Sequence, residues 1–216
     1  MRIDPAGWPF VGGFAAVALA AGLLWSPRAA LPGVALAAAM LFFFRDPERR
    51  SPTDPAVVLA PADGRIIVAG PSLAAAWPAE SWVQVSTFLS PLDVHVNRMP
   101  VAGRVTRVEY HPGRFLPAYR VESGERNERT EVRLDTPAGP VVVRQVVGLL
   151  ARRIVCRTRA GATVVAGERF GVMKFGSRMD VFLPRDAALA VRPGDRVVAG
   201  ESTIAMLHPR AAEGES

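Results

Sequence analysis

Apolar residues are concentrated at the start of the chain, where two uncharged runs stand close together. No charged residue occurs between Asp4 and Arg28, and the run from Trp8 to Trp25 consists of apolar residues and glycine. At about 1.5 Å of rise per residue, a helix of this length nearly crosses the core of a bilayer, and tryptophan at both ends is typical of membrane interfaces. A second uncharged run, residues 29–44, is shorter. Together they predict that residues 1–44 form a helical hairpin that anchors the protein in a membrane.

The arginines beside these runs indicate an orientation for the anchor. Three arginines lie within residues 45–50, whereas the turn between the runs carries the single Arg28. By the positive-inside tendency, the downstream domain is expected on the cytoplasmic side of the cell (inner) membrane. A cleavable signal peptide is the alternative. It is disfavoured because Asp4 follows Arg2 closely and because a second apolar run stands where a mature domain would begin.

Beyond the anchor, short strand-like runs replace the long apolar ones. Residues 45–56 form a polar linker punctuated by proline, and the remainder of the chain alternates strand-like runs with turns of Gly, Pro and Asp. The clearest predicted strands are residues 82–89, 103–110, 130–134 and 141–147. Pro137-Ala138-Gly139 between the last two predicts a hairpin. No long amphipathic helix is evident, so residues 57–216 are predicted to form one mainly β domain, a compact sandwich or barrel.

An internal repeat refines this fold prediction. Residues 159–168, with the sequence RAGATVVAGE, recur as RPGDRVVAGE at residues 192–201. Each copy is interpreted as a glycine turn, a short strand, a second glycine turn and a returning strand, the unit of lipoyl-like and biotinyl-like β domains. Two copies are too few for a solenoid, so they are expected to form pseudo-symmetric hairpins of one domain.

Composition adds little to the choice of function. The formal charge of +6 comes almost wholly from arginine, because Lys174 is the only lysine. A basic balance suits phosphate, nucleic acid or an anionic membrane surface, and charge alone does not choose among them. Cys156 is the only cysteine, which excludes an internal disulfide and fits a reducing compartment. Its place in an apolar run predicts a small buried hydrophobe.

Gly176 and Ser177 are the first candidate for chemistry, because they interrupt two strand-like segments at a predicted sharp bend. A serine hydroxyl held against the preceding carbonyl can attack it and convert the peptide to an ester, and glycine leaves that carbonyl open. Elimination of the ester would give dehydroalanine, which hydrolyses to a pyruvoyl group at the new chain start. Gly-Ser by itself is unspecific and would be interpreted as an ordinary turn.

Other stretches of the sequence support the interpretation of this pair as a cleavage site. They are residues 43–49 (FFRDPER), 60–65 (APADGR), 89–100 (LSPLDVHVNRMP), 110–113 (YHPG), 127–129 (NER), 148–154 (GLLARRI), 167–171 (GERFG) and 175–178 (FGSR). In order and spacing they resemble the short bacterial form of phosphatidylserine decarboxylase, and the resemblance covers nearly the whole chain. The longer relatives carry LGST at the cut.

The resemblance implies both processing and activity. It implies a proenzyme that cuts itself between Gly176 and Ser177 into a large membrane-associated chain and a small chain, which remain together as a heterodimer. The cofactor would be a pyruvoyl group formed from Ser177. Through a Schiff base with the substrate, it would convert membrane phosphatidylserine to phosphatidylethanolamine and carbon dioxide. Neither a metal nor a nucleic-acid partner belongs to this interpretation.

His95 is the best candidate for a general acid or base, since its unperturbed pKa is about 6.5, although a histidine in an alternating strand often only packs. In long relatives an Asp, His and Ser triad assists self-cleavage. By resemblance its aspartate corresponds to Asp63, which is expected to orient His95; an Asp-Gly turn is the plain alternative. Long relatives have two histidines after Leu-Ser-Pro, whereas Arg98 stands at the second position here. Either His95 alone serves in place of both histidines, or another group replaces the second one.

Three further residues are candidates for substrate binding. His111 precedes a Pro-Gly turn and could contact a head-group phosphate or only cap the turn. Arg152 and Arg153 follow an apolar run and could meet lipid phosphate or only be solvated.

A rival function belongs to another class, a non-catalytic carrier or adaptor tethered to the membrane. Lipoyl-like hairpins occur in such proteins, and Met173-Lys174 resembles the tip on which biotin is attached. Phe175 follows where a carrier would have methionine, and the coiled-coil hairpins of adaptors are not evident, so the enzyme is favoured.

Overall fold

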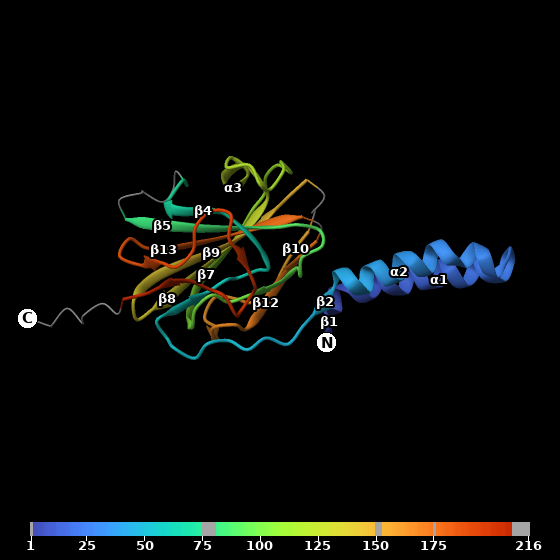
Figure 1. Ribbon diagram of the computed structural model, residues 1–216, viewed down its shortest axis with the longest axis horizontal. Coiled ribbons are helices and arrows are strands. Elements are labelled where there is room, and N and C mark those ends of the chain that lie inside the picture. Colours follow the sequence, from blue (N-terminus) through green and yellow to red (C-terminus); the bar gives the residue numbers. More distant parts are fainter. Residues whose placement is uncertain (1, 75–80, 150–152, 175, 209–216) are drawn as a thin grey trace, which may run out of the picture.

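The computed structural model describes residues 2–74, 81–149, 153–174 and 176–208. In this part of the chain, two helices project from one end of a β domain (Figure 1). A predominance of strand and an apolar helical amino terminus agree with the predicted fold class.

The two projecting helices pack against each other. Their segments are η1 (Pro5–Gly7), α1 (Trp8–Leu24), η2 (Pro27–Ala30) and α2 (Leu31–Phe43). The helices approach closely where a Cβ on Gly33 would lie 2.8 Å from the Cβ of Ala18. Small residues at a helix crossing and exposed leucines elsewhere, such as Leu23 at 78% exposure, are typical of helices in lipid. Pro5–Leu24 is long and apolar enough to span a membrane, whereas the second helical segment is shorter.

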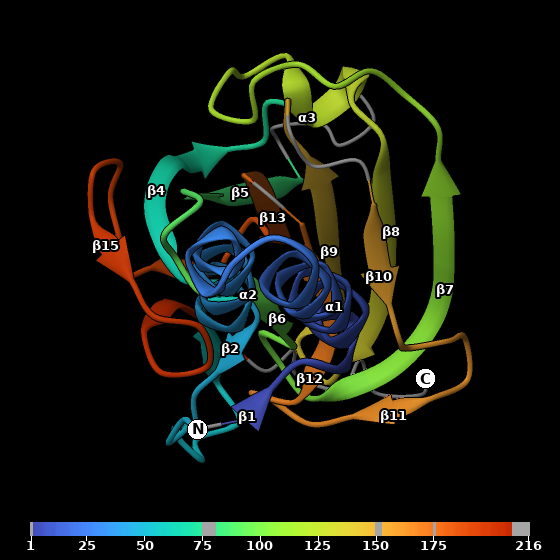
Figure 2. The ribbon, with the colours of Figure 1, turned by 90° about the vertical axis from the view of Figure 1, so that its right-hand side faces the viewer.

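Most strands belong to one antiparallel sheet with the order β11-β7-β8-β9-β13-β5-β4-β15. Viewed along the hairpin, this sheet curls from β7 on one side to β15 on the other as a half-barrel (Figure 2). Its members are β4 (Gly64–Pro71), β5 (Trp82–Leu89), β7 (Gly103–His111), β8 (Arg129–Thr136), β9 (Gly139–Val147), β11 (Thr163–Val164), β13 (Ser177–Pro184) and β15 (Arg196–Val197). All four predicted strands are confirmed, and so is the hairpin between β8 and β9, where Gly139 has φ of 108°.

Three smaller sheets complete the fold. β1 (Arg2–Ile3) pairs with β2 (Arg45–Asp46) at the base of the hairpin, and the other two sheets have the orders β10-β12-β6 and β14-β16-β3. Their strands are β3 (Val57–Leu59), β6 (Val96–Arg98), β10 (Ile154–Cys156), β12 (Arg169–Met173), β14 (Ala188–Leu189) and β16 (Thr203–Met206), and a short helix, α3, spans Ser123–Arg126. Cys156 packs half-buried against the core, and is therefore less buried than expected.

The repeated segments occupy equivalent places, but they are not hairpins. Each copy contains an edge strand of the large sheet, β11 or β15, and its returning strand, β12 or β16, follows the copy as the central strand of a small sheet. Gly161 and Gly194 both have positive φ, of 87° and 101°, and each donates its N–H to the large sheet at 2.8 Å. The two strands of a copy pair in different sheets, so the predicted hairpins are wrong and lipoyl-like hairpin units are not confirmed.

Candidate active site

Ser177 lies at the first position of β13, deep inside the domain. It pairs with Leu89 of β5 and Val147 of β9 and is fully buried. Gly176 before it has φ of 70°, a left-handed conformation that favours glycine, which confirms the predicted bend. Within the described residues the Ser177 hydroxyl makes no hydrogen bond. A buried hydroxyl without a partner is costly, and its oxygen remains available for attack.

Gly148, just after β9, presses against the carbonyl of Gly176. A Cβ added at Gly148 would lie 2.2 Å from that carbonyl oxygen, far inside van der Waals contact. The glycine that follows β9 is therefore required by the position of the peptide group between Gly176 and Ser177.

A Gly148→Ala change is expected to displace the Gly176 carbonyl and slow the cut. Overpacking of this kind costs about 1–3 kcal/mol. Added to the activation free energy of cleavage, this cost makes the reaction roughly five- to hundredfold slower. Electrophoresis of newly synthesised protein over time measures this rate. Gly12→Ala is the matched control, because a Cβ there meets open space. Equal cleavage rates in the two variants would contradict the expectation.

His95 stands beside the same peptide group. Its Nε2 accepts a hydrogen bond of 3.4 Å from the N–H of Gly176, and its Nδ1 lies 2.9 Å from the carbonyl oxygen of Asp93. Because a carbonyl can only accept, Nδ1 carries the hydrogen and Nε2 keeps a lone pair. Burial is the main reason that the pKa of His95 is lowered to about 4. The imidazole is therefore neutral at pH 7.

Asp63 has partners other than His95. Its carboxylate accepts from Arg49 at 2.8 Å and from the N–H of Ala199 at 2.8 Å. Burial raises the pKa of Asp63, while these two partners oppose that shift. Among the described residues no hydrogen bond joins Asp63 to His95; Asp93 holds the imidazole instead. Sequence reasoning missed Asp93, because the contact is made by its backbone carbonyl, which leaves no signal in a side-chain pattern.

Arg98, which stands where long relatives have a second histidine, is occupied elsewhere. It is buried and contacts Asp46 at 3.1 Å and the carbonyl of Gly167 at 3.0 Å. It therefore ties the linker to the domain. A guanidinium held in this way is unsuited to replace a titrating histidine.

The predicted head-group contacts are not gathered at Ser177. His111 ends β7, three strands from β13, which is about 14 Å at ordinary strand spacing. Its Nε2 lies 3.9 Å from Glu131, whose carboxylate is engaged by Arg144 at 2.8 Å. Arg153 is exposed before β10, and Arg152 lies outside the described residues.

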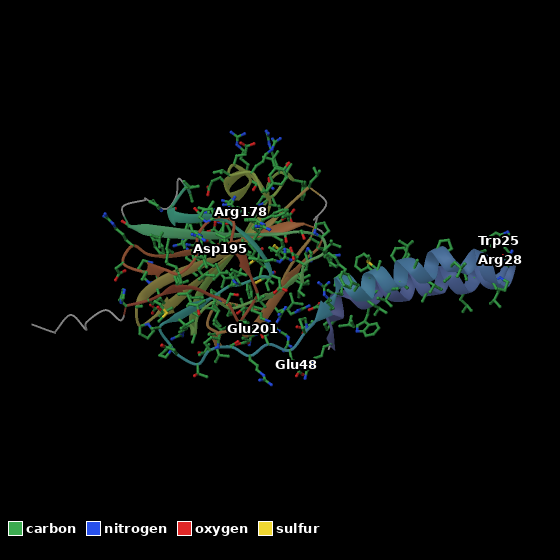
Figure 3. All side chains as sticks on the ribbon, in the orientation of Figure 1. Trp25, Arg28, Glu48, Arg178, Asp195 and Glu201 are labelled. Carbon is green, nitrogen blue, oxygen red and sulfur yellow. The ribbon has the colours of Figure 1, made fainter. Side chains whose placement is uncertain are left out.

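A buried ion pair follows the bond between Gly176 and Ser177, on the opposite face of β13. Nε of Arg178 contacts Asp180 at 2.5 Å, and the same guanidinium donates to Ser86 Oγ at 3.0 Å and to the Arg120 carbonyl at 3.2 Å. Figure 3 labels Arg178 inside the β domain, whereas Trp25 and Arg28 lie at the far tip of the hairpin. The network joins the residue after Ser177 to the segment around α3, and sequence reasoning missed it.

An apolar pocket of about 200 Å³ reaches Gly176. Besides this glycine it is lined by Phe88, Pro91, Pro117, Ala118, Tyr119 and Leu149. The candidate cut site thus combines a buried hydroxyl, a neutral imidazole and an adjacent apolar cavity.

Comparison with known proteins identifies the family of the chain. A family model of phosphatidylserine decarboxylase matches residues 36–205. The phosphatidylserine decarboxylase proenzyme of Symbiobacterium thermophilum is 48% identical over 203 residues, which are 93% of this chain and 94% of the relative. Both matches include the segment around Ser177, and the chain therefore belongs to the phosphatidylserine decarboxylase family.

Proposed function

We propose that this protein cuts itself between Gly176 and Ser177 and then decarboxylates phosphatidylserine to phosphatidylethanolamine and carbon dioxide. The observation that carries the proposal is the buried, unpartnered Ser177 hydroxyl, which follows a left-handed glycine and lies beside the neutral imidazole of His95. The family match supports the substrate.

The cut can be written as a balanced sequence. The Ser177 hydroxyl attacks the Gly176 carbonyl carbon, and the bond from that carbon to the Ser177 nitrogen breaks, leaving an ester and an amine. Loss of the Ser177 α-hydrogen as a proton then breaks the Cβ–O bond, so that Gly176 keeps a carboxylate and residue 177 becomes dehydroalanine. Water converts this residue to a pyruvoyl group and releases ammonia.

His95 is proposed as the base of the first step. Its Nε2 lone pair lies at the scissile peptide, and its low pKa keeps that lone pair free at neutral pH. Asp93 fixes the tautomer through its carbonyl. Asp63, which interacts with the linker, is proposed to position this region without touching the imidazole.

The two products of the cut are expected to stay together. The small chain would begin with β13, which pairs along its whole length with β5 and along most of it with β9, both in the large chain. The new end would therefore remain inside the sheet, with the Arg178–Asp180 pair fixing its second residue.

After the cut, a pyruvoyl group would supply a carbonyl that condenses with the substrate amine and withdraws electrons as carbon dioxide leaves. The apolar pocket beside Gly176 suits a hydrocarbon part of the lipid, and His95 is placed to hold or return a proton beside Gly176. The hairpin of residues 1–44 would hold the domain of residues 57–216 at the cytoplasmic face of the cell membrane through the linker of residues 45–56.

Intact mass and denaturing electrophoresis of the purified protein test the proposal. Two fragments divided at Ser177 are expected, the small one blocked to amino-terminal sequencing, together with release of labelled carbon dioxide from carboxyl-labelled phosphatidylserine in detergent. A single intact chain, or one that carries biotin or lipoate, would support the carrier class instead.

A further inference from the structure

The end of the membrane hairpin reaches the candidate active site. Phe43, the last residue of α2, lies with its ring centroid 4.1 Å from that of His95 and the two planes inclined by 34°. Phe43 is 5% exposed, whereas Phe42 beside it is 51% exposed. The exposed part of the helix therefore ends before Phe43, whose ring packs against the histidine.

Both helices converge on this contact. Phe44 is fully buried and packs edge-on against Phe43 at 5.0 Å and stacked on Phe10 of α1 at 5.7 Å. The backbone of Gly7 approaches so closely that a Cβ there would lie 2.5 Å from the Phe44 ring. The N–H of Asp4 donates to the Phe44 carbonyl at 2.8 Å. Phe43 is consequently held by the hairpin as a unit.

Buried carboxylates fasten the base of the hairpin to the domain. Asp4, on the α1 side, makes a two-point contact with Arg157 at 2.7 and 2.8 Å. Asp46, on the α2 side, contacts Arg98 at 3.1 Å and Arg169 at 2.6 Å. Charge-assisted and two-point bonds of this kind restrict orientation as well as distance.

A third contact acts on the segment that precedes His95. Arg45 donates to the carbonyl of Leu92 at 2.7 Å, in the turn that leads to Asp93 and His95. The hairpin therefore contacts the histidine itself through Phe43, and Arg45, the first residue of the linker, contacts the turn that leads to it.

We propose that the end of the membrane hairpin is a structural part of the active site, with Phe43 as a positioning residue that covers His95 and holds its Nε2 beside the scissile peptide. The inference rests on the proposed role of His95. It adds that the hairpin is required for self-cleavage even in detergent, beyond any role in holding the enzyme near lipid. It also assigns a structural role to Phe43 and Phe44, the two aromatic residues of the FFRDPER segment.

The covering of His95 by Phe43 should be detectable in the pH dependence of self-cleavage. Burial is the largest cause of the lowered pKa of His95, and the charged groups that act on the ring are Asp93, which raises the pKa, and Arg45, which lowers it. Lys174 belongs to the same cluster, with Nζ 4.7 Å from the centre of the Phe10 ring. Removing the Phe43 ring admits water, so the pKa of His95 is expected to move up from about 4 toward its ordinary 6.5.

The test compares Phe43→Ala with Leu41→Ala, a truncation on the same helix at a side chain that is 36% exposed. Proenzyme from cell-free synthesis in detergent is followed by electrophoresis at several pH values. Phe43→Ala is expected to cut about ten- to a hundredfold more slowly at pH 7, because small misplacements of a catalytic group have effects of this size. The acid limb of its profile, where the cleavage rate falls at low pH, should lie at higher pH than in the wild type. Leu41→Ala should match the wild type.

A Phe43→Ala protein with the wild-type rate and acid limb would overturn the proposal. If that variant fails to fold, as shown by circular dichroism, Phe43→Leu decides, because it keeps an apolar cover and loses the flat ring. Because leucine keeps His95 covered, a slower cut with little change in its pH dependence supports the proposal, and the wild-type rate overturns it. Failure of the wild type to split would instead count against the proposed function.

Discussion

Ser177→Ala is expected to give a single uncut chain without decarboxylase activity. Alanine has no hydroxyl to attack the Gly176 carbonyl, so the peptide stays an amide and no pyruvoyl group can form at residue 177. Both readouts should be lost together, to the detection limit of electrophoresis and of carbon dioxide release. No other change in the chain is expected to remove both so completely.

The structure allows this loss to be separated from unfolding. Within the described residues the Ser177 hydroxyl makes no hydrogen bond, so its removal leaves no partner unsatisfied and the thermal unfolding temperature should scarcely change. Ser81→Ala, at an exposed serine, is the matched control and should split normally. Two fragments from the Ser177→Ala protein would refute a cut that begins at this hydroxyl.

The local features of the fold were predictable because local patterns determine them. The alternation in residues 82–89 and the turn at Pro137-Ala138 lead directly to β5 and to the β8–β9 hairpin. The repeat at residues 159–168 and 192–201 also predicted equivalent structures. It could not predict that the strands of each copy pair in different sheets, because a strand's partner depends on the whole fold.

The reactive residues of the candidate site were predictable from the sequence, but the contacts that support them were not. Ser177 and His95 were chosen for their chemistry, and the structure brings them together at Gly176. The support of His95 was assigned to Asp63, but a backbone carbonyl at Asp93 and a ring from the membrane hairpin are what contact the imidazole. A carbonyl carries no signal in a side-chain pattern, and a contact between α2 and the domain arises only in the folded chain.

The buried Arg178–Asp180 pair shows the same limit. Charges that alternate with apolar residues usually mark a solvated sheet face. Here the segment around α3 covers that face, and carbonyls of the covering segment satisfy the guanidinium. A charged residue next to the cut is therefore structural, which no property of the isolated strand could reveal.

His95→Ala is expected to slow self-cleavage by about 10²–10⁴-fold, the usual contribution of a general base. In the proposed mechanism the neutral imidazole is the active form, and its pKa of about 4 means that it stays neutral well below pH 6.5. The cleavage rate should therefore be level from pH 8 to about pH 5 and fall to half near pH 4. An acid limb near 6.5 would contradict a buried base.

Protonation also links His95 to folding, with a sign that follows from the lowered pKa. Between pH 6.5 and about 4 the unfolded chain binds a proton that the folded chain excludes, so the contribution of His95 to stability falls as the pH falls through this window. His95→Gln cannot titrate there, and it should lose both the pH-dependent stability term and the base while retaining much of the packing against Phe43. His208→Ala, at an exposed histidine, should change neither. Because a merely structural histidine would tolerate glutamine, a His95→Gln protein that folds but cuts as slowly as His95→Ala would assign the effect to the lone pair on Nε2.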